Sequence, residues 1–306
     1  MKNGKCPLIY HPSYDIALPD THRFPGTKYS LLIAELERTG LIKRYLKYIP
    51  KPATPENLSI AHAPSYIESV RTGNLTKQQQ ATLGLPWSEA LKKRAFVAPS
   101  GTLLAAQLAL QSRVACHVAG GTHHAHRHFG AGFCVFNDLA FAALAMVKLK
   151  LVKKVLILDC DVHQGDGTAS ILANDKEIFT CSIHCAENYP TKKAKSDLDL
   201  PISKGAGDGE YLAIVNQGLL EIDRLHFYPD LVLYDAGVDV HRNDKLGLLD
   251  MSSDGIRERD ELILSYFKKR CVPIVTTIGG GYGETREEVA QRHSIVFSAV
   301  QNVFGC

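Results

Sequence analysis

Residues 155–163 read Val-Leu-Ile-Leu-Asp-Cys-Asp-Val-His, so a short aliphatic run leads directly into carboxylates and an imidazole. Uninterrupted Val, Ile and Leu are typical of a parallel strand that is buried on both faces. Asp161 and His163 are two residues apart, so an extended chain points both side chains to the same side. A carboxylate oxygen and an imidazole nitrogen together suit Zn²⁺ or a similar divalent ion. The stretch therefore predicts a buried strand that ends at a metal site, with hydrogen bonding to loop backbone as the alternative for both polar residues.

The rest of the chain repeats this alternation of short apolar and longer amphipathic segments. We predict four more buried strands at 114–118, 178–183, 231–234 and 273–278. We predict helices at 102–111, 138–150, 210–226, 256–270 and 284–304. Strands that alternate with helices form a parallel sheet with helices on both faces. Residues 1–306 are therefore predicted to form one doubly wound α/β domain, with roughly the first 90 residues supplying loops and helices around it.

The composition is that of an ordinary globular chain, in which 45% of the residues are hydrophobic and 22% are charged. Lys and Arg number 35 against 32 Asp and Glu, which leaves a net charge of +3. Proteins that coat nucleic acid usually carry a concentrated basic face, so this weak bias argues against a direct nucleic-acid partner. An enzyme is therefore the leading class.

Three features of the sequence predict a cytoplasmic protein. The eight cysteines form no Cys-x-x-Cys pair and most lie in apolar runs, so we expect buried free thiols. The first residues, Met1 to Pro7, lack the apolar core of a signal peptide. The longest uncharged run, residues 95–112, contains Pro99, Ser100 and Gly101, so no membrane span is predicted.

Polar residues cluster immediately after each predicted strand. The carboxyl ends of parallel strands meet at one edge of the sheet, where ligands bind in open α/β folds, so these residues should converge. Asp239 is well placed to be a third metal ligand beside Asp161 and His163. Three protein ligands leave one position open, which marks a catalytic rather than a structural site. The converging residues are His123 and His124; Asp159, Asp161 and His163; Ser182 and His184; Asp235 and Asp239; and Tyr282.

Four histidines occur in residues 120–128, which read Gly-Gly-Thr-His-His-Ala-His-Arg-His. The adjacent pair at 123 and 124 cannot easily hold one ion, but two imidazoles can act as separate proton carriers. We expect His126 and His128 to be exposed and non-catalytic. Asp159 and Asp166 could orient the tandem imidazoles. A strand-end hydrogen bond for Asp159 and a loop cap for Asp166 remain equally open.

Residues 279–283 read Gly-Gly-Gly-Tyr-Gly. They lack the Lys and Ser/Thr of a phosphate-binding P-loop and the spacing of a dinucleotide fingerprint. Three glycines indicate a backbone that passes close to a site, and the phenol of Tyr282 could donate to a developing oxyanion. A simple turn from strand to helix is the alternative.

Taken in order, five motifs resemble the signatures of zinc-dependent histone deacetylases and their bacterial relatives, from about Tyr10 to the C-terminus. The compact length, Tyr10-His-Pro-Ser-Tyr14, His22-Arg-Phe-Pro25 with Lys28-Tyr29, and Gln164 in place of a second histidine favour the class IV branch or the bacterial group near it. The five motifs are Gly120-Gly-Thr-His-His124, Gly132-Phe-Cys-Val-Phe-Asn-Asp138, Asp159-Cys-Asp-Val-His-Gln-Gly-Asp-Gly167, Ala236-Gly-Val-Asp239 and Gly279-Gly-Gly-Tyr282.

The resemblance implies an arginase/deacetylase-like fold and assigns roles in catalysis. It implies that Asp161, His163 and Asp239 bind zinc, with iron as the alternative metal in the cell. His123 and His124 would be the tandem histidines, partnered by Asp159 and Asp166 respectively, with His124 as the general base. Tyr282 would hydrogen-bond the substrate carbonyl as it becomes tetrahedral.

The resemblance also implies two supporting sets of residues. Gly132, Phe133 and Tyr189 would line a narrow acyl-lysine tunnel. A structural potassium ion would be held by Asp159, the backbone of Asp161 and His163, and Ser182 with Ile183.

The implied reaction is zinc-dependent hydrolysis of N-acyl-lysine amides by metal-activated water, as a deacetylase or a long-chain fatty deacylase. Residues 72–93 do not clearly show the rim aspartate with which many relatives grip the substrate backbone. The expected partners are therefore acyl-lysine proteins or peptides, or small N-acyl amines such as acetylated polyamines. A two-metal, arginase-like ureohydrolase would need more Asp and His ligands than residues 236–240 offer. A non-catalytic binding module is disfavoured because every expected catalytic position is filled.

Overall fold

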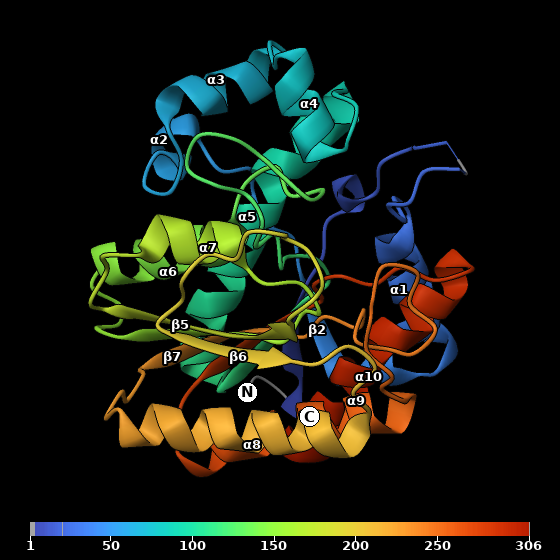
Figure 1. The fold of residues 1–306 in the computed structure, drawn as a ribbon, viewed down its shortest axis with the longest axis vertical. Coiled ribbons are helices and arrows are strands. Elements are labelled where there is room, and N and C mark those ends of the chain that lie inside the picture. Colours follow the sequence, from blue (N-terminus) through green and yellow to red (C-terminus); the bar gives the residue numbers. More distant parts are fainter. Residues whose placement is uncertain (1–3, 20, 306) are drawn as a thin grey trace.

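Eight strands form one parallel sheet in the computed structural model, which describes residues 4–19 and 21–305 (Figure 1). Across the sheet the strands lie in the order β2-β1-β3-β8-β7-β4-β5-β6. The chain crosses from β3 to β4, runs outward to β6, and then returns to place β7 and β8 between β4 and β3. The strands are β1 (Cys6–Ile9), β2 (Tyr45–Tyr48), β3 (Val114–His117), β4 (Val155–Asp159), β5 (Ile178–Cys185), β6 (Leu198–Ile202), β7 (Leu231–Asp235) and β8 (Ile274–Thr277).

Helices cover both faces of the sheet. On one side α5 packs against α6 and α6 against α7, while α1, α10, α9 and α8 pack in succession on the other. The short helices α2, α3 and α4 form the lobe at the top of Figure 1. The helices are α1 (Lys28–Arg38), α2 (Pro55–Leu58), α3 (Pro64–Thr72), α4 (Lys77–Leu83), α5 (Glu89–Ser112), α6 (Asp138–Lys148), α7 (Asp166–Leu172), α8 (Asp208–Arg224), α9 (Ser253–Lys269) and α10 (Arg286–Phe304), with 3-10 turns η2 (Pro12–Tyr14) and η3 (Leu41–Arg44).

Alternate residues of each central strand enter two different cores. In β4, Val155 and Ile157 pack with the alanine-rich face of α5 and α6, whereas Leu156 and Leu158 enter the opposite core. Successive side chains of a strand point to opposite faces, so an entirely apolar strand must be covered on both sides. The predicted doubly wound parallel sheet flanked by helices is confirmed.

The N-terminal part of the chain contributes more than predicted, because β1 and β2 belong to the sheet. The expectation that this part supplies loops and helices was therefore incomplete. β1 is a four-residue strand that contains Pro7, and the edge strand β2 reads Tyr-Leu-Lys-Tyr, so neither gives a clear apolar run. The other edge strand, β6, was missed for the same reason, since it contains Asp199 and Pro201. An edge strand pairs on one side and therefore tolerates proline.

Helix α5 begins well before the predicted start at residue 102. The side chain of Ser88 caps it by accepting a hydrogen bond from the amide of Leu91, 3.1 Å away. The helix then continues through Pro99. Proline lacks an amide hydrogen and usually ends or kinks a helix, which is why the sequence suggested a later start. The other four predicted helices are present, with ends shifted by up to three residues.

The cysteines follow the prediction in part. Six of the described cysteines are free, and all of these except Cys271 are buried. Cys6 is also buried but is disulfide-bonded, so the expectation of free thiols was wrong there. None of the described helices is both long and apolar enough to cross a membrane.

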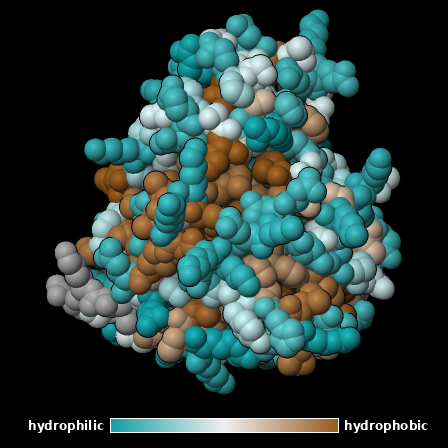
Figure 2. Space-filling view, turned by 90° about the vertical axis from the view of Figure 1, so that its left-hand side faces the viewer, coloured by the Kyte–Doolittle hydropathy of each residue, from teal (hydrophilic) through white to brown (hydrophobic). Residues whose placement is uncertain are grey.

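One side of the molecule exposes apolar groups. Leu149 and Leu151, just after α6, are 56% and 46% exposed. Figure 2 views the molecule from the left side of Figure 1 and shows a hydrophobic surface in the middle of that face, surrounded by hydrophilic residues.

A buried arginine ties together the loops that follow β4 and β7. Arg259 of α9 is completely buried and forms an ion pair with Asp260 at 2.9 Å. Its Nη1 donates to the carbonyl oxygen of Gly237 at 2.7 Å and to that of Cys160 at 3.3 Å. A charged group that bonds backbone of two loops fixes the distance between them, which matters because both loops carry site residues.

Replacing Arg259 with alanine is expected to lower the free energy of unfolding by roughly 3–5 kcal/mol, because it leaves Asp260 buried without its partner. Urea denaturation followed by circular dichroism measures this change. Arg257→Ala is the matched control on the same helix, since the ion pair of Arg257 with Asp254 is solvent-exposed and should contribute at most about 1 kcal/mol. Equal midpoints for the two variants would contradict the role given to Arg259.

Candidate metal centre and active site

The three predicted metal ligands converge at the carboxyl edge of the sheet. Asp161 and His163 lie on the loop after β4, and Asp239 lies on the loop after the neighbouring strand β7. Nδ1 of His163 is 3.0 Å from Oδ1 of Asp161 and 3.2 Å from Oδ2 of Asp239. All three residues are buried, and one ligand atom from each lies within 4.8 Å of the others. Two carboxylates and one imidazole fit a divalent ion such as zinc and leave a coordination position open.

The electrostatics of this trio also favour a cation. Burial opposes protonation of His163, but its hydrogen bonds to Asp161 and Asp239 raise its pKa to about 10. Burial and the nearby Asp161 raise the pKa of Asp239 to about 6. Both shifts arise because negative charge is concentrated in a buried volume, and a bound divalent cation would compensate that charge.

Backbone amides hold the two carboxylates in place. The amide of Gly280 donates to Oδ2 of Asp161 at 2.7 Å, and the amide of Val162 donates to Oδ1 of Asp239 at 2.9 Å. A Cβ atom at residue 280 would lie 2.1 Å from Oδ2 of Asp239 and 2.5 Å from Oδ2 of Asp161. Glycine is required by this close approach, as expected for a glycine run that passes beside a site.

A second group of possible ligands shares Asp161. His123, Asp161 and Asp235 also bring ligand atoms within 4.8 Å of one another. Oδ1 of Asp235 accepts a hydrogen bond from Thr277, but its Oδ2 is buried without a hydrogen-bond partner in the described part of the chain. Burial and the nearby Asp159 raise the pKa of Asp235 well above its ordinary value. His123 is already paired with Asp159, so the first trio is the better metal site.

The tandem histidines stand beside the trio, each held by its own carboxylate. Nδ1 of His123 lies 2.7 Å from Oδ2 of Asp159, and Nδ1 of His124 lies 2.7 Å from Oδ1 of Asp166. The two Nε2 atoms are 3.1 Å apart. The structure thus brings these four residues together as two dyads. Asp159 also accepts the amide of Asp161 at 3.0 Å, so it makes the strand-end hydrogen bond as well.

The two imidazoles have opposite protonation preferences. Burial opposes the charged form of His123, but the carboxylates of Asp159 and Asp161 raise its pKa well above the ordinary value. Burial and the adjacent His123 lower the pKa of His124 to about 4. Two neighbouring groups whose pKa values are pushed apart can serve as an acid and a base at one pH.

Tyr282 follows β8 and reaches the same edge. Burial, together with Asp161 and Asp239, raises its pKa well above the ordinary value, so the phenol keeps its proton and can donate it in a hydrogen bond. Its main chain is held by Asp244, to which the sequence drew no attention. Oδ2 of Asp244 accepts the amide of Tyr282 at 2.6 Å, and Oδ1 accepts those of Leu246 and Gly247 at 2.8 and 2.9 Å.

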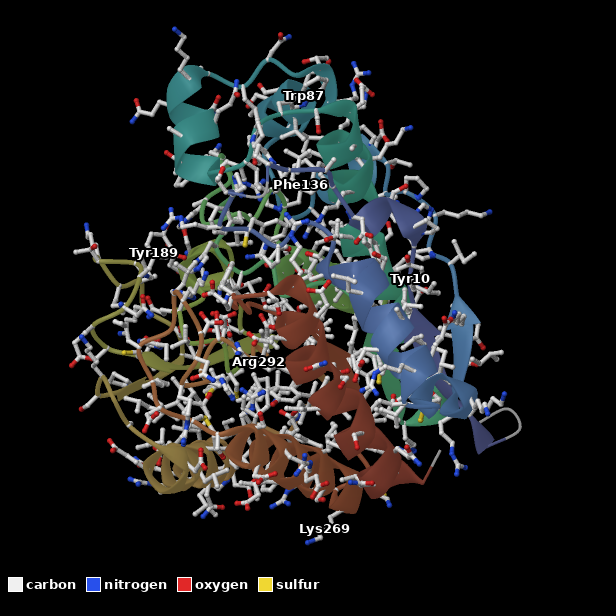
Figure 3. All side chains as sticks on the ribbon, turned by 90° about the vertical axis from the view of Figure 1, so that its right-hand side faces the viewer. Tyr10, Trp87, Phe136, Tyr189, Lys269 and Arg292 are labelled. Carbon is white, nitrogen blue, oxygen red and sulfur yellow. The ribbon has the colours of Figure 1, made fainter. Side chains whose placement is uncertain are left out.

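A cavity of about 300 Å³ reaches from exposed residues down to His124, His163 and Tyr282. Gly132, Phe133 and Tyr189 all line it, as the tunnel prediction requires. The ring of Tyr189 lies 4.8 Å from that of His124 and nearly perpendicular to it. Tyr189 is 41% exposed and lies near the outer edge of the molecule in Figure 3. A Cβ at residue 132 would lie 2.5 Å from Cδ2 of His124, so glycine lets the tunnel wall approach the imidazole.

The predicted potassium ligands lie at the end of β4, within the neighbouring strand β5 and on the loop that follows β4. Asp159 and Ser182 are register partners on these strands, and Ile183 follows on β5. Asp161 and His163 lie on the loop that continues from β4.

The two remaining histidines of the 120–128 segment differ. His128 is exposed, as predicted. The expectation of exposure was wrong for His126, which is partly buried, stacks on Phe129 with ring centroids 4.5 Å apart, and places Nε2 3.2 Å from Oδ2 of Asp166.

Three further residues support the site without having been assigned a role. The side-chain Nδ2 of Asn137 donates to the carbonyl oxygens of His123 and Ala125, each at 3.2 Å, and Oδ1 of Asp138 accepts a hydrogen bond from the backbone amide of Thr122 at 2.7 Å. These bonds hold the loop of the tandem histidines. Lys28 is buried and donates to the carbonyl oxygen of Gly279 at 2.8 Å, and burial and the nearby Arg94 lower its pKa to about 8. Lys28 drew attention only as part of the N-terminal resemblance, because distant contacts leave no local pattern.

Fold and site together define a parallel α/β enzyme whose carboxyl edge carries an Asp-His-Asp centre and two His–Asp dyads. Comparisons agree with this class. The family model described as "Histone deacetylase domain" matches residues 22–299. The chain is 42% identical over 298 residues to an uncharacterized protein of Picosynechococcus sp., covering 97% of this chain and 99% of that relative. It is 29% identical to histone deacetylase 2 of Arabidopsis thaliana, covering 94% of this chain and 77% of the relative.

The chain belongs to the histone deacetylase family and is a hydrolase of that family. Its fold is similar to that in the crystal structure of acetylpolyamine aminohydrolase from Burkholderia pseudomallei, with a TM-score of 0.80 at 20% identity. That likeness covers 98% of this chain and 99% of the other, and it bears on the fold alone.

Proposed function

We propose that this chain hydrolyses N-acyl-lysine amides, as a zinc-dependent deacetylase or long-chain fatty deacylase of the class IV-like branch. The observation that carries the proposal is the placement of two His–Asp dyads beside Asp161, His163 and Asp239 at the end of a 300 Å³ cavity. Its apolar lining, which includes Leu83, Phe133 and Leu246, suits the aliphatic stem of an acylated lysine. Membership of the family supports an acylated amine as the substrate.

Asp161, His163 and Asp239 would hold the zinc, with Fe²⁺ as the alternative in the cell. A divalent ion at this position supplies Lewis acidity, which polarises an acyl carbonyl and lowers the pKa of water. Asp159, Ser182, Ile183 and the backbone of Asp161 and His163 would hold a structural potassium ion. This position, where β4 leads into the loop of the metal trio, lets the second ion stiffen that loop.

The two dyads divide the proton transfers between them. His124 is neutral because its pKa is low, and its Nδ1 is bonded to Asp166, so its Nε2 can accept a proton from the attacking water. His123 is protonated because of Asp159, so it can give a proton to the leaving lysine amine. Tyr282 keeps its proton and donates a hydrogen bond to the carbonyl oxygen as negative charge develops there.

The test is turnover, followed by mass spectrometry, of lysine peptides that carry acetyl, octanoyl or myristoyl groups, with acetylated polyamines in the same panel. Wild-type protein loaded with zinc should cleave at least one of them, and the preferred chain length reports the size of the tunnel. His124→Ala should lower the rate by roughly 100- to 10,000-fold, the usual contribution of a positioned acid or base.

His128→Ala is the matched control, since it removes an exposed imidazole from the same loop and should leave the rate unchanged. Zinc-loaded protein that cleaves nothing in the panel would contradict the proposal and favour a binding role or a different amide. Equal rates for His124→Ala and wild type would remove His124 from the reaction.

A further inference from the structure

One cation stands at the mouth of the substrate cavity. The residues that line this cavity include Arg23, and no Asp or Glu is among them within the described part of the chain. The remaining ionisable members are Tyr189, whose phenol is uncharged at neutral pH, and His124, His163 and Tyr282, which belong to the site at the inner end. The charge that an incoming substrate meets first on the cavity wall is therefore positive.

The neighbours of Arg23 hold it at this position. Nδ1 of His22 accepts a hydrogen bond from the backbone amide of Phe24 at 3.0 Å, and its Nε2 lies 3.1 Å from the carbonyl oxygen of Gly84. Gly84 ends α4, whose last turn forms part of the cavity wall. Residues 22–24 are thus a short bridge fastened to α4, and Arg23 is its middle residue.

The same bridge rests on the tunnel wall. The rings of His22 and Phe24 lie 5.9 and 5.6 Å from the ring of Phe133. The guanidinium of Arg23 lies 5.9 Å from the centroid of that ring, within the range of a cation–π contact. Arg23 is exposed and makes no ion pair with any described residue, so its charge is available to a ligand.

Among the described residues that line the cavity, none on the side of Asn188 and Tyr189 carries a negative charge. Asn188 and Tyr189 line that side, and Lys193 places its ammonium against the same segment, 2.7 Å from the carbonyl oxygen of Pro190. The carboxylate of Asp244 accepts hydrogen bonds from three backbone amides, those of Leu246, Gly247 and Tyr282. Glu284 is paired with Lys245 at 2.8 Å.

We propose that Arg23 selects substrates by charge, so that the enzyme prefers acyl-lysine flanked by acidic residues and disfavours acetylated polyamines. This inference rests on the proposed function and narrows its substrate class. A carboxylate beside the acyl-lysine can pair with the guanidinium of Arg23, because the planar fork of N–H donors in a guanidinium matches the two oxygens of a carboxylate. A polyamine brings further ammonium groups to the same mouth and is repelled.

The experiment compares kcat/KM for three peptides whose lysine carries the acyl group preferred in the first panel, with glutamate, alanine or lysine flanks, and for spermidine carrying the same acyl group, on wild type, Arg23→Ala and Arg23→Glu. Wild type should favour the glutamate peptide over the lysine peptide and cleave the acylated spermidine worst. An exposed ion pair changes an equilibrium by up to roughly fivefold, so Arg23→Glu should shift the preference toward the lysine peptide by on the order of tenfold. The shift should shrink as salt rises, because charges are screened over about 10 Å at 0.1 M ionic strength.

Arg224→Glu is the matched control, because it makes the same charge change at the exposed end of α8. If the alanine peptide is turned over and Arg23→Glu and Arg224→Glu show the same preference between glutamate and lysine flanks, charge selection by Arg23 is overturned and the proposed function is not affected. If no peptide is turned over with acetyl, octanoyl or myristoyl on its lysine, the proposed function is contradicted instead. Fluorescence-anisotropy binding of the same peptides to wild type and Arg23→Glu then decides the inference, since equal affinities for acidic and basic peptides would overturn it.

Discussion

Asp239→Ala is expected to abolish the stoichiometric zinc binding that we propose and to lower kcat/KM by roughly 1,000-fold or more. The side chain supplies one of the two carboxylates of the trio. Among the described residues, Asp239 is the only carboxylate that forms a possible metal-binding group with both Asp161 and His163. Lewis acidity contributes several kcal/mol to reactions of this kind, and each 1.36 kcal/mol corresponds to about a factor of ten in rate. Two quantities are measured on the same sample: the metal content, by inductively coupled plasma mass spectrometry, and the turnover of the preferred peptide.

Two controls separate metal loss from misfolding. Asp250→Ala removes a carboxylate whose side chain is 60% exposed, from the segment that continues beyond Asp239, and should keep both metal and activity. Chelation of the wild-type protein should abolish turnover, and added zinc should restore it. Full activity of Asp239→Ala, or of wild type after complete chelation, would show that the trio does not hold the catalytic ion.

Tyr282→Phe is expected to retain zinc and inhibitor binding and to lose turnover by on the order of 100-fold or more, the usual effect of removing an oxyanion donor. The phenol keeps its proton and lines the same cavity as His124. The substitution removes one hydroxyl and leaves the ring, which contacts Phe133 at 6.0 Å. The loss should therefore fall on kcat, while KM changes little.

Tyr45→Phe is the matched control for the loss of a phenolic hydroxyl. Its OH donates to the carbonyl oxygen of Phe297 at 2.6 Å, between β2 and α10. That variant should lose roughly 1 kcal/mol of stability and no catalytic rate. If Tyr282→Phe turned over at the wild-type kcat, the phenol would have no part in the reaction.

The periodicity of the sequence was sufficient to predict five strands, β3, β4, β5, β7 and β8, and five helices, α5, α6, α8, α9 and α10. Residues 155–158 are aliphatic without interruption, and such a strand requires cover on both faces, which defines the doubly wound sheet. The two edge strands at the ends of the sheet could not be predicted, because a strand with a single partner needs neither a continuous apolar run nor freedom from proline. The extent of α5 was hidden for a related reason, since a proline that local rules place at a helix end lies inside it.

The sequence by itself determined which residue types reach the carboxyl edge and which family the chain belongs to. Asp161, His163 and the tandem histidines could be singled out because each follows directly from a strand and carries chemistry that packing does not require. The resemblance implied the pairing in the two dyads, whereas only the tertiary structure showed that the partly buried His126 also lies against Asp166. Lys28, Asp244 and Arg23 are the clearest cases. The partners of Lys28 lie as far as 265 residues away along the chain, and a side chain acquires such a role only when folding brings distant residues into contact.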